Sequence, residues 1–114
     1  MAQLLDLERM VVLIPRLELA NSFLKRFVGL LGAKEIADDY GLVFRSCDSV
    51  HSYLMKTNFD VIFLDEAMQI VEVVQEVRPW RLVRSKVGKH CIECAPGFAQ
   101  KNGIKPGMLV EIID

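Results

Sequence analysis

The first side chains that could take part in chemistry lie in one stretch, residues 49–65, with the sequence SVHSYLMKTNFDVIFLD. His51 and Asp60 lie within it, and an imidazole with a carboxylate can act as a general acid and base. They are the one pair that we nominate for catalysis, with Glu93 as a distant third. The chain has no glycine-rich phosphate loop, nucleophile elbow or paired-carboxylate motif, so an enzyme is the less favoured hypothesis.

A basic segment follows at residues 78–89. It contains no acid and five cations, which are Arg78, Arg81, Arg84, Lys86 and Lys89. Cations beside Trp80 could bind a phosphate, another anionic ligand or single-stranded nucleic acid. One aromatic is no stacking platform, so nucleic acid is not expected as a partner. The structural alternative is a solvated loop in which Trp80 covers one end of the fold and one arginine pairs with Asp60.

Asp60 stands at the start of a short apolar run, residues 61–64. A carboxylate in that place is expected to be half buried, and it must then find a cation or several hydrogen-bond donors. The candidate partners are Arg26, Arg78, Arg81 and His51.

Soft ligands and cysteines offer two further chemistries. His51, Tyr53 and Met55 would share a strand face, which Cys47 would join if the strand began early, and a set of Cys47, His51 and Met55 suits Cu(I). The alternative is that Met55 and Tyr53 are core and His51 is a hydrogen-bonded structural residue. Cys91 and Cys94 resemble a redox motif, but residues three apart on a strand point to opposite faces, and the following helix begins too late to lower a thiol pKa. Buried, inert thiols are expected, and no metal or cofactor is assigned.

Composition predicts a single domain, residues 1–114, with 52% hydrophobic residues and a net charge of −1. That charge gives no general attraction to nucleic acid or membranes. Asp6 and Glu8 interrupt what would be the apolar region of a signal peptide, and no run is long enough to span a membrane. Three cysteines, an odd count, suggest a reducing compartment. We therefore expect a cytoplasmic monomer or weak dimer.

Apolar periodicity predicts about seven short strands and two helices. The helices are expected at about residues 19–31, on the three-to-four spacing of apolar residues, and from Pro96 onward. Seven strands are expected at residues 10–14, 41–44, 50–55, 61–64, 69–77, 90–94 and 108–113, and residues 4–7 could add a short edge strand. The short connections favour antiparallel pairing. The expected fold class is α+β, mainly antiparallel β, with a small curled or barrel-like sheet and two short helices.

Several separated motifs resemble a known family. SVHSYLMKTNFDVIFLD is followed by VRPWR and by CIECAPGFAQKNGIKPGMLVEI, and ANSFLKRFVGLLG and GLVFRSCDSVH lie upstream. Together they are similar to the family called domain of unknown function 192, over nearly all of the chain from about Met10 on. The resemblance implies a compact, β-rich single domain, secreted or cytosolic. It implies no reaction.

The chain departs from the family pattern in the loop after FLD. Members usually carry glycine where Met68 stands, and glycine takes a positive φ at no cost. Met68 is therefore expected to be strained by roughly 1 kcal/mol, unless the loop takes another form. Members also commonly have proline at Asn58, aspartate at Met108 and aliphatic residues at Cys91 and Cys94, which argues against cysteine chemistry as a family property.

The leading hypothesis is a small binding or accessory module. Its site would be a polar rim for a small anionic ligand or a partner peptide, formed by His51, Asp60, Arg78, Trp80 and Arg81. The alternatives are an enzyme that uses His51 with Asp60, and a soft-metal protein.

Overall fold

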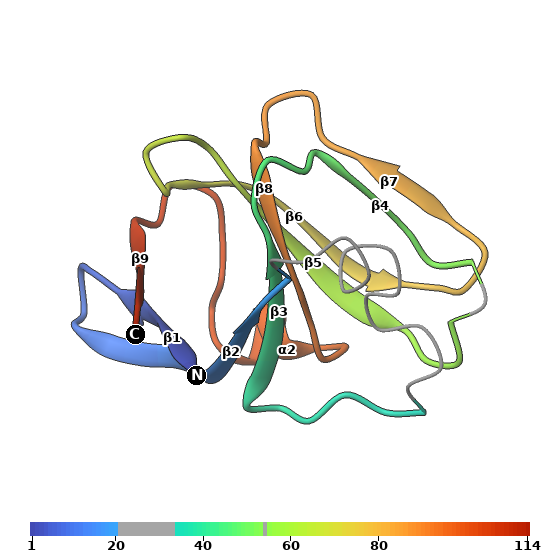
Figure 1. The fold of residues 1–114 in the computed structure, drawn as a ribbon, viewed down its shortest axis with the longest axis horizontal. Coiled ribbons are helices and arrows are strands. Elements are labelled where there is room, and N and C mark those ends of the chain that lie inside the picture. The colour runs from blue at the N-terminus through green and yellow to red at the C-terminus, as the bar shows by residue number, and fades with distance from the viewer. Residues whose placement is uncertain (21–33, 54) are drawn as a thin grey trace.

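The computed structural model describes residues 1–20, 34–53 and 55–114, and these form a mainly β fold (Figure 1). Seven strands make one curled sheet, a half-barrel, in the order β6-β5-β8-β3-β2-β1-β9. Strands β4 and β7 form a separate two-stranded ribbon. The strands are β1 (Ala2–Asp6), β2 (Val11–Leu19), β3 (Tyr40–Phe44), β4 (Ser49–His51), β5 (Phe59–Leu64), β6 (Ile70–Val77), β7 (Leu82–Arg84), β8 (His90–Cys94) and β9 (Val110–Ile113).

The half-barrel curls because its two edge strands approach each other. An isolated bridge joins Gln69, just before β6, to Leu109, just before β9. The amide of Ile70 also donates to the carbonyl of Met108 at 2.8 Å. The pairing is mainly antiparallel, as predicted, although β2 and β3 run parallel.

The prediction of an α+β fold with two helices needs correction. The described residues contain one short helix, α2 (Phe98–Lys101), so the fold is mainly β. The other helix was expected at residues 19–31, and all but the first two of these positions lie outside the described residues. Leu19 itself ends strand β2, because β2 continues through Pro15 instead of stopping there. No helix in the described ranges is long and apolar enough to cross a membrane.

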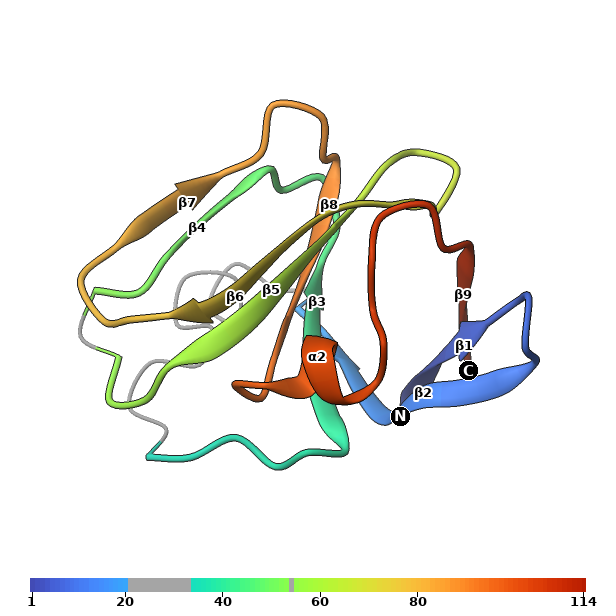
Figure 2. The ribbon, with the colours of Figure 1, turned by 180° about the vertical axis from the view of Figure 1, so that it is seen from behind.

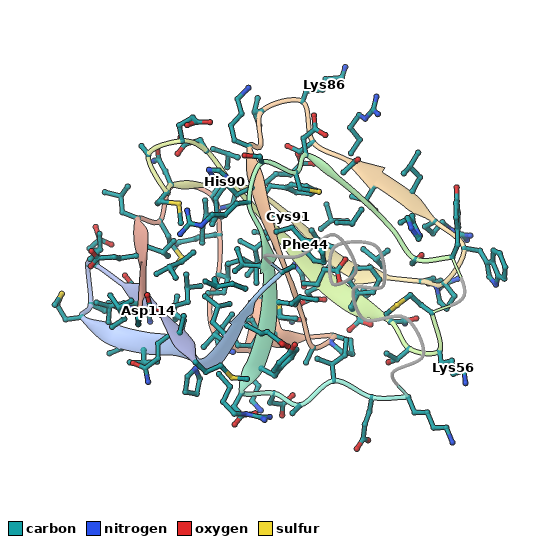
Figure 3. All side chains as sticks on the ribbon, viewed as in Figure 1. Phe44, Lys56, Lys86, His90, Cys91 and Asp114 are labelled. Atoms are coloured by element: carbon teal, nitrogen blue, oxygen red, sulfur yellow. The ribbon has the colours of Figure 1, made fainter. Side chains whose placement is uncertain are left out.

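Strand β5 forms the centre of the core, and the prediction of a strand buried on both faces is confirmed. All its residues are buried, and it pairs with β6 on one side and β8 on the other. Alternate side chains of a strand point to opposite faces, so both faces of this part of the sheet are covered. Figure 3 shows Phe44 and Cys91 among the side chains at the centre of the molecule, whereas Lys56, Lys86 and Asp114 lie at its periphery.

The strand predicted at residues 50–55 ends at His51. The chain then turns, and the amide of Met55 donates to the carbonyl of Ser52 at 3.1 Å. Tyr53 is consequently exposed and Met55 is buried in the core. The predicted face shared by His51, Tyr53 and Met55 is therefore wrong for Met55.

The loop after β5 has the strained form expected from the sequence. Met68 adopts a φ of 63°. The carboxylate of Asp65 accepts hydrogen bonds from the amides of Ala67 and Gln69, both at 2.9 Å. The side chain of Asp65 thus holds the hairpin in which Met68 must take a positive φ.

Candidate functional site

An exposed stack of three rings lies on and beside the β4–β7 ribbon. The centroids of His51 and Tyr53 are 5.0 Å apart, those of Tyr53 and Trp80 are 6.0 Å apart, and both interplanar angles are 28°. Tyr53 is 43% exposed and Trp80 is 61% exposed. Aromatic rings are the side chains that contribute most to binding surfaces, because they offer a large apolar area at low entropic cost.

A buried serine positions this stack. Ser52 stands between His51 and Tyr53 in the sequence, and its side chain is fully buried. Its amide donates to the carbonyl of Arg81 at 2.8 Å, and its carbonyl accepts from the amide of Trp80 at 3.0 Å. Its hydroxyl oxygen accepts from the amide of Arg81 at 2.8 Å and its hydroxyl donates to the carbonyl of Arg78. Four hydrogen bonds thus fix the turn from Arg78 to Arg81 against the end of β4.

The backbone at Trp80 is strained. Its φ is 65°, in the left-handed region that favours glycine. A bulky residue there costs on the order of 1–3 kcal/mol, and such strain persists only where the surrounding structure imposes it. Here the bonds of Ser52 impose it. The result is an indole that stacks on Tyr53 with most of its surface in solvent.

Three arginines lie close to Trp80 in the chain. Arg78, Arg81 and Arg84 are all exposed. The one side-chain hydrogen bond among them runs from Nη1 of Arg81 to the carbonyl of Trp80 at 3.4 Å, and none of the three forms an ion pair with a described carboxylate. Their positive charges are therefore available to a partner. We call the five residues His51, Tyr53, Arg78, Trp80 and Arg81 the rim.

Asp60 does not belong to the rim. Its exposed fraction is 0%. Its carboxylate accepts from the amides of Glu76 at 2.9 Å, Gly97 at 3.2 Å and Ala99 at 2.9 Å. Glu76 lies in an irregular part of β6 with a φ of 54°, and Ala99 lies in the first turn of α2. The carboxylate thus ties a bulged strand to a helix, which is a structural role.

The cations predicted as partners of Asp60 are therefore corrected to backbone amides. In the described residues, no hydrogen bond or ion pair joins Asp60 to Arg78, Arg81 or His51. The fourth candidate, Arg26, lies outside those residues. His51 is exposed whereas Asp60 is buried, so the structure does not bring the nominated acid–base pair together.

The other predicted chemistry also lies away from the rim. The thiol of Cys47 donates to the carbonyl of Ser49 at 3.0 Å. Cys91 and Cys94 are fully buried, as expected, and burial raises the pKa of the Cys94 thiol well above its usual value. A buried thiol with a raised pKa is a poor nucleophile. Within the described ranges, no three His, Cys, Asp or Glu side chains could together hold a metal ion.

Glu93 is buried on β8 and is no part of the rim. Burial, with a smaller contribution from the nearby Cys47, raises the pKa of its carboxyl to about 8. Because desolvation disfavours the charged form, Glu93 takes up its proton in the folded protein well above the usual pH.

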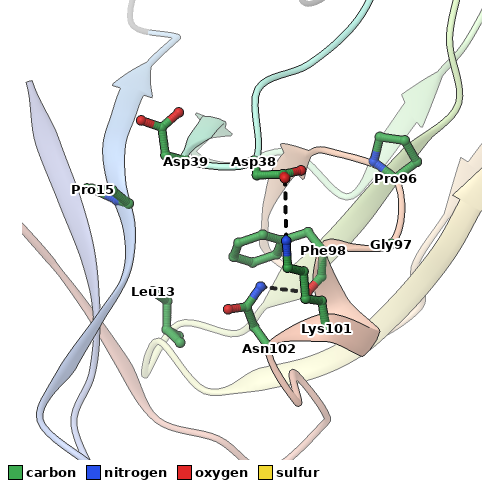
Figure 4. A pocket seen from close by; sticks show the side chains of 9 residues that line it. All are labelled: Leu13, Pro15, Asp38, Asp39, Pro96, Gly97, Phe98, Lys101 and Asn102. Carbon is green, nitrogen blue, oxygen red and sulfur yellow. Dashed lines mark hydrogen bonds and ion pairs between the residues drawn. The ribbon is translucent and has the colours of Figure 1, made fainter.

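A cavity of about 460 Å³ lies beside α2 (Figure 4), and none of the rim residues lines it. Its charged side chains already have partners. Lys101 pairs with Asp38 at 3.5 Å, and Asp39 pairs with Arg16 at 2.7 Å. The side-chain Nδ2 of Asn102 donates to the carbonyl of Phe98 at 2.9 Å. This cavity therefore offers fewer free polar groups than the rim.

The fold and the rim define a small, mainly β protein with an exposed aromatic and basic surface. The chain belongs to the family domain of unknown function 192, described as an uncharacterized ACR, whose model matches residues 8–112. The resemblance seen in the sequence motifs is thereby confirmed.

The relatives are proteins without an assigned activity. A UPF0127 protein of Thermococcus sibiricus is 37% identical over 89 residues, which are 72% of this chain and 56% of the relative. A UPF0127 protein of Pyrococcus horikoshii is 37% identical over 95 residues, 77% of each chain. The matched region also spans 63% of a Thermococcus kodakarensis relative, so this chain is shorter than some proteins that it matches.

Two crystal structures share the fold. A protein of unknown function from Novosphingobium aromaticivorans superposes with a TM-score of 0.81 and 21% identity, over 96% of this chain and 82% of that one. A protein titled a putative transcription regulator from Sinorhizobium meliloti superposes with a TM-score of 0.77 and 19% identity, over 97% and 91%. At these identities, the likeness concerns the fold alone.

Proposed function

We propose that this protein is a binding module that captures an anionic partner on the rim. The observation that carries the proposal is the combination of an exposed aromatic stack with arginines that have no acidic partner among the described residues. A guanidinium suits carboxylate and phosphate oxygens, because its planar fork donates two parallel hydrogen bonds. Aromatic and arginine side chains are also the commonest binding hot spots.

The arrangement of the rim supports binding more than catalysis. Ser52 holds the backbone of the turn before β7, so the backbone positions of Trp80 and Arg81 are set before a partner arrives. Preorganisation lowers the entropic cost of association. The proposal assigns the module to the cytoplasm, since all three cysteines are free, and a monomer or weak dimer suffices for it.

Trp80 makes the proposal directly testable, because it is the only tryptophan in the chain. The purified protein would be titrated with tripolyphosphate, citrate and oligoglutamate while indole fluorescence and Tm are recorded. At a hundred times the Kd, a bound ligand adds about 2.7 kcal/mol of stability. We expect at least one of these anions to change the fluorescence and to raise Tm.

The matched variants are an Arg78→Ala, Arg81→Ala double variant and Lys105→Ala, which removes an exposed charge far from the rim in the sequence. We expect the double variant to bind the anion that gave a response about tenfold or more weakly, as for the loss of charge-assisted hydrogen bonds. Lys105→Ala should bind it with unchanged affinity. Equal binding by all three proteins, or no response to any anion, would overturn the proposal.

A further inference from the structure

We infer that the outer edge of β7 is a strand-pairing edge, on which an extended acidic segment of another protein adds a third strand to the β4–β7 ribbon. This inference rests on the proposed function and names its partner class. It follows from the hydrogen-bond register of the ribbon, the exposure of the edge and the charge around it.

The register decides which backbone groups of β7 are free. Ser52 donates to the carbonyl of Arg81, and Ser85 donates to the carbonyl of Asp48. In an antiparallel ladder, hydrogen-bonded pairs alternate with pairs whose amides and carbonyls point away from each other. Since His51 pairs with Leu82 and Ser49 with Arg84, these are the pairs that point outward.

Leu82 and Arg84 therefore direct their amides and carbonyls away from β4. The ribbon contains no other strand, so β7 has one strand partner in the described part of the chain. In Figures 1 and 2, β7 runs along the outer side of the ribbon, with β4 between it and the half-barrel. Leu82 is 63% exposed and Arg84 is exposed as well. Nothing described covers this edge.

A free strand edge invites pairing with other chains, and charged side chains restrict which ones. Arg84 lies on β7 and Arg81 immediately precedes the strand. These two positive charges disfavour pairing between two copies of this edge. The same charges attract an acidic segment, because opposite charges across a strand pair are stabilising and like charges are not. An extended peptide gains affinity from main-chain hydrogen bonds and specificity from alternate side chains.

The side chains of the edge predict a short motif. In a strand pair, directly opposed residues have their side chains on the same face. The residue opposite Leu82 should be apolar, because Leu82 is an exposed apolar side chain on the same face of the ribbon as its pairing partner His51. The residue opposite Arg84 should be acidic. A second acidic residue, on the other side of the apolar peptide residue, would lie toward Arg81 and Arg78. The motif is acid-x-apolar-x-acid, which reads the same in both chain directions.

The probe is a synthetic peptide with blocked ends and the core Glu-Thr-Ile-Thr-Glu. Two peptide variants carry the same number of N-methyl groups on backbone nitrogens. In the first variant the isoleucine and a glutamate are methylated, and in the second variant the two threonines are methylated. An N-methyl group removes one backbone donor. Only alternate backbone amides of a paired peptide point toward β7, so methylation of one set of amides should block pairing and methylation of the other set should not. We expect one methylated peptide to bind like the parent and the other to lose about tenfold or more in affinity.

Amide hydrogen exchange supplies the second readout. On binding of the parent peptide, the amides of Leu82 and Arg84 should gain protection, whereas that of Val83 is already paired with β4. Equal affinities of both methylated peptides, or unchanged exchange at Leu82 and Arg84, would overturn strand pairing.

The result separates this inference from the proposed function. If tripolyphosphate or citrate binds in an Arg81-dependent way while none of the peptides bind, the rim is a binding site and the pairing edge is refuted. If neither the anions nor the peptides bind, both proposals fall. A lysine version of the peptide, with Lys in place of both Glu, is expected to lose binding and serves as the charge control.

Discussion

The hydroxyl oxygen of Ser52 lies 2.8 Å from the amide nitrogen of Arg81, and this bond joins the end of β4 to the turn that carries the rim. Both residues also share a backbone hydrogen bond of 2.8 Å. A small buried polar residue therefore determines where the exposed ring of Trp80 and the charge of Arg81 are placed.

Ser52→Ala should lower stability and loosen the rim. The change leaves the amide of Arg81 and the carbonyl of Arg78 without their hydroxyl partner in a partly buried place, and the loss of two hydrogen bonds costs about 1–3 kcal/mol. Urea denaturation measures the loss. Ser49→Ala is the control, because its hydroxyl makes no hydrogen bond in the described residues and should cost much less. Equal losses in the two variants would contradict the role given to Ser52.

Replacing Trp80 by glycine and by alanine separates strain from binding. Both variants lose the indole, but glycine adopts a φ near 65° without penalty and alanine does not. Trp80→Gly should be more stable than Trp80→Ala by about 1 kcal/mol, as measured by the urea midpoint. Both should lose anion binding equally. A Trp80→Ala variant as stable as Trp80→Gly would show that the backbone relaxes once the ring is gone.

Asp60→Asn should destabilise the fold without changing the rim. The amide group of asparagine keeps one acceptor and places an NH₂ group against backbone donors, so at least one of the three amides of Glu76, Gly97 and Ala99 loses its acceptor. We expect a loss of about 2–3 kcal/mol, as for hydrogen bonds to a charged group.

Anion affinity measured below the unfolding transition of this variant should match that of the native sequence. A weakened affinity in fully folded Asp60→Asn protein would return Asp60 to the binding site.

Stability should depend on pH through Glu93. Its pKa is raised to about 8 in the folded state from 4.5, so the folded protein binds the proton more tightly than the unfolded chain. The stabilisation is complete below pH 4.5 and is lost as the pH rises toward 8, with a limiting slope of about 1.4 kcal/mol per pH unit.

The measurement is a series of urea denaturations between pH 5 and about pH 8. Glu93→Gln keeps the shape of the side chain and cannot ionise, so its stability should vary less over this range than that of the native sequence. Parallel pH profiles would refute the assignment of the dependence to Glu93.

Quenching of Trp80 should reveal the positive potential of the rim. Iodide should quench the indole more efficiently than caesium, since Arg78 and Arg81 concentrate anions near the exposed ring. Arg78→Ala with Arg81→Ala should reduce the ratio of the two quenching constants, and added salt should reduce it as well. Acrylamide, which is uncharged, controls for changes in exposure.

Local patterns determined much of the fold. The apolar run of β5, the strand at residues 90–94 and the hairpin at Met68 follow from neighbouring residues, and each agrees with the structure. Burial on both faces and a forced positive φ leave a signature in adjacent positions. The family, too, could be identified from short motifs, and the family model confirms it.

Only the tertiary structure decided the candidate site. The sequence marked His51, Trp80 and Arg81, but the stack needs Tyr53, and its rigidity needs Ser52, whose partners lie in a distant segment. Neither residue differs from an ordinary strand residue by type or spacing.

The same reason explains the error at Asp60 and the omission of β7. A buried carboxylate needs donors, but whether a guanidinium or a set of backbone amides supplies them depends on which loops meet there. In this fold, those loops are the bulge of β6 and the start of α2. Strand β7 pairs with β4, and backbone hydrogen bonds from Ser52 to Arg81 and from Ser85 to Asp48 hold its two ends. Composition and periodicity determined most of the strands, whereas contacts between distant segments determined which surface is free to bind.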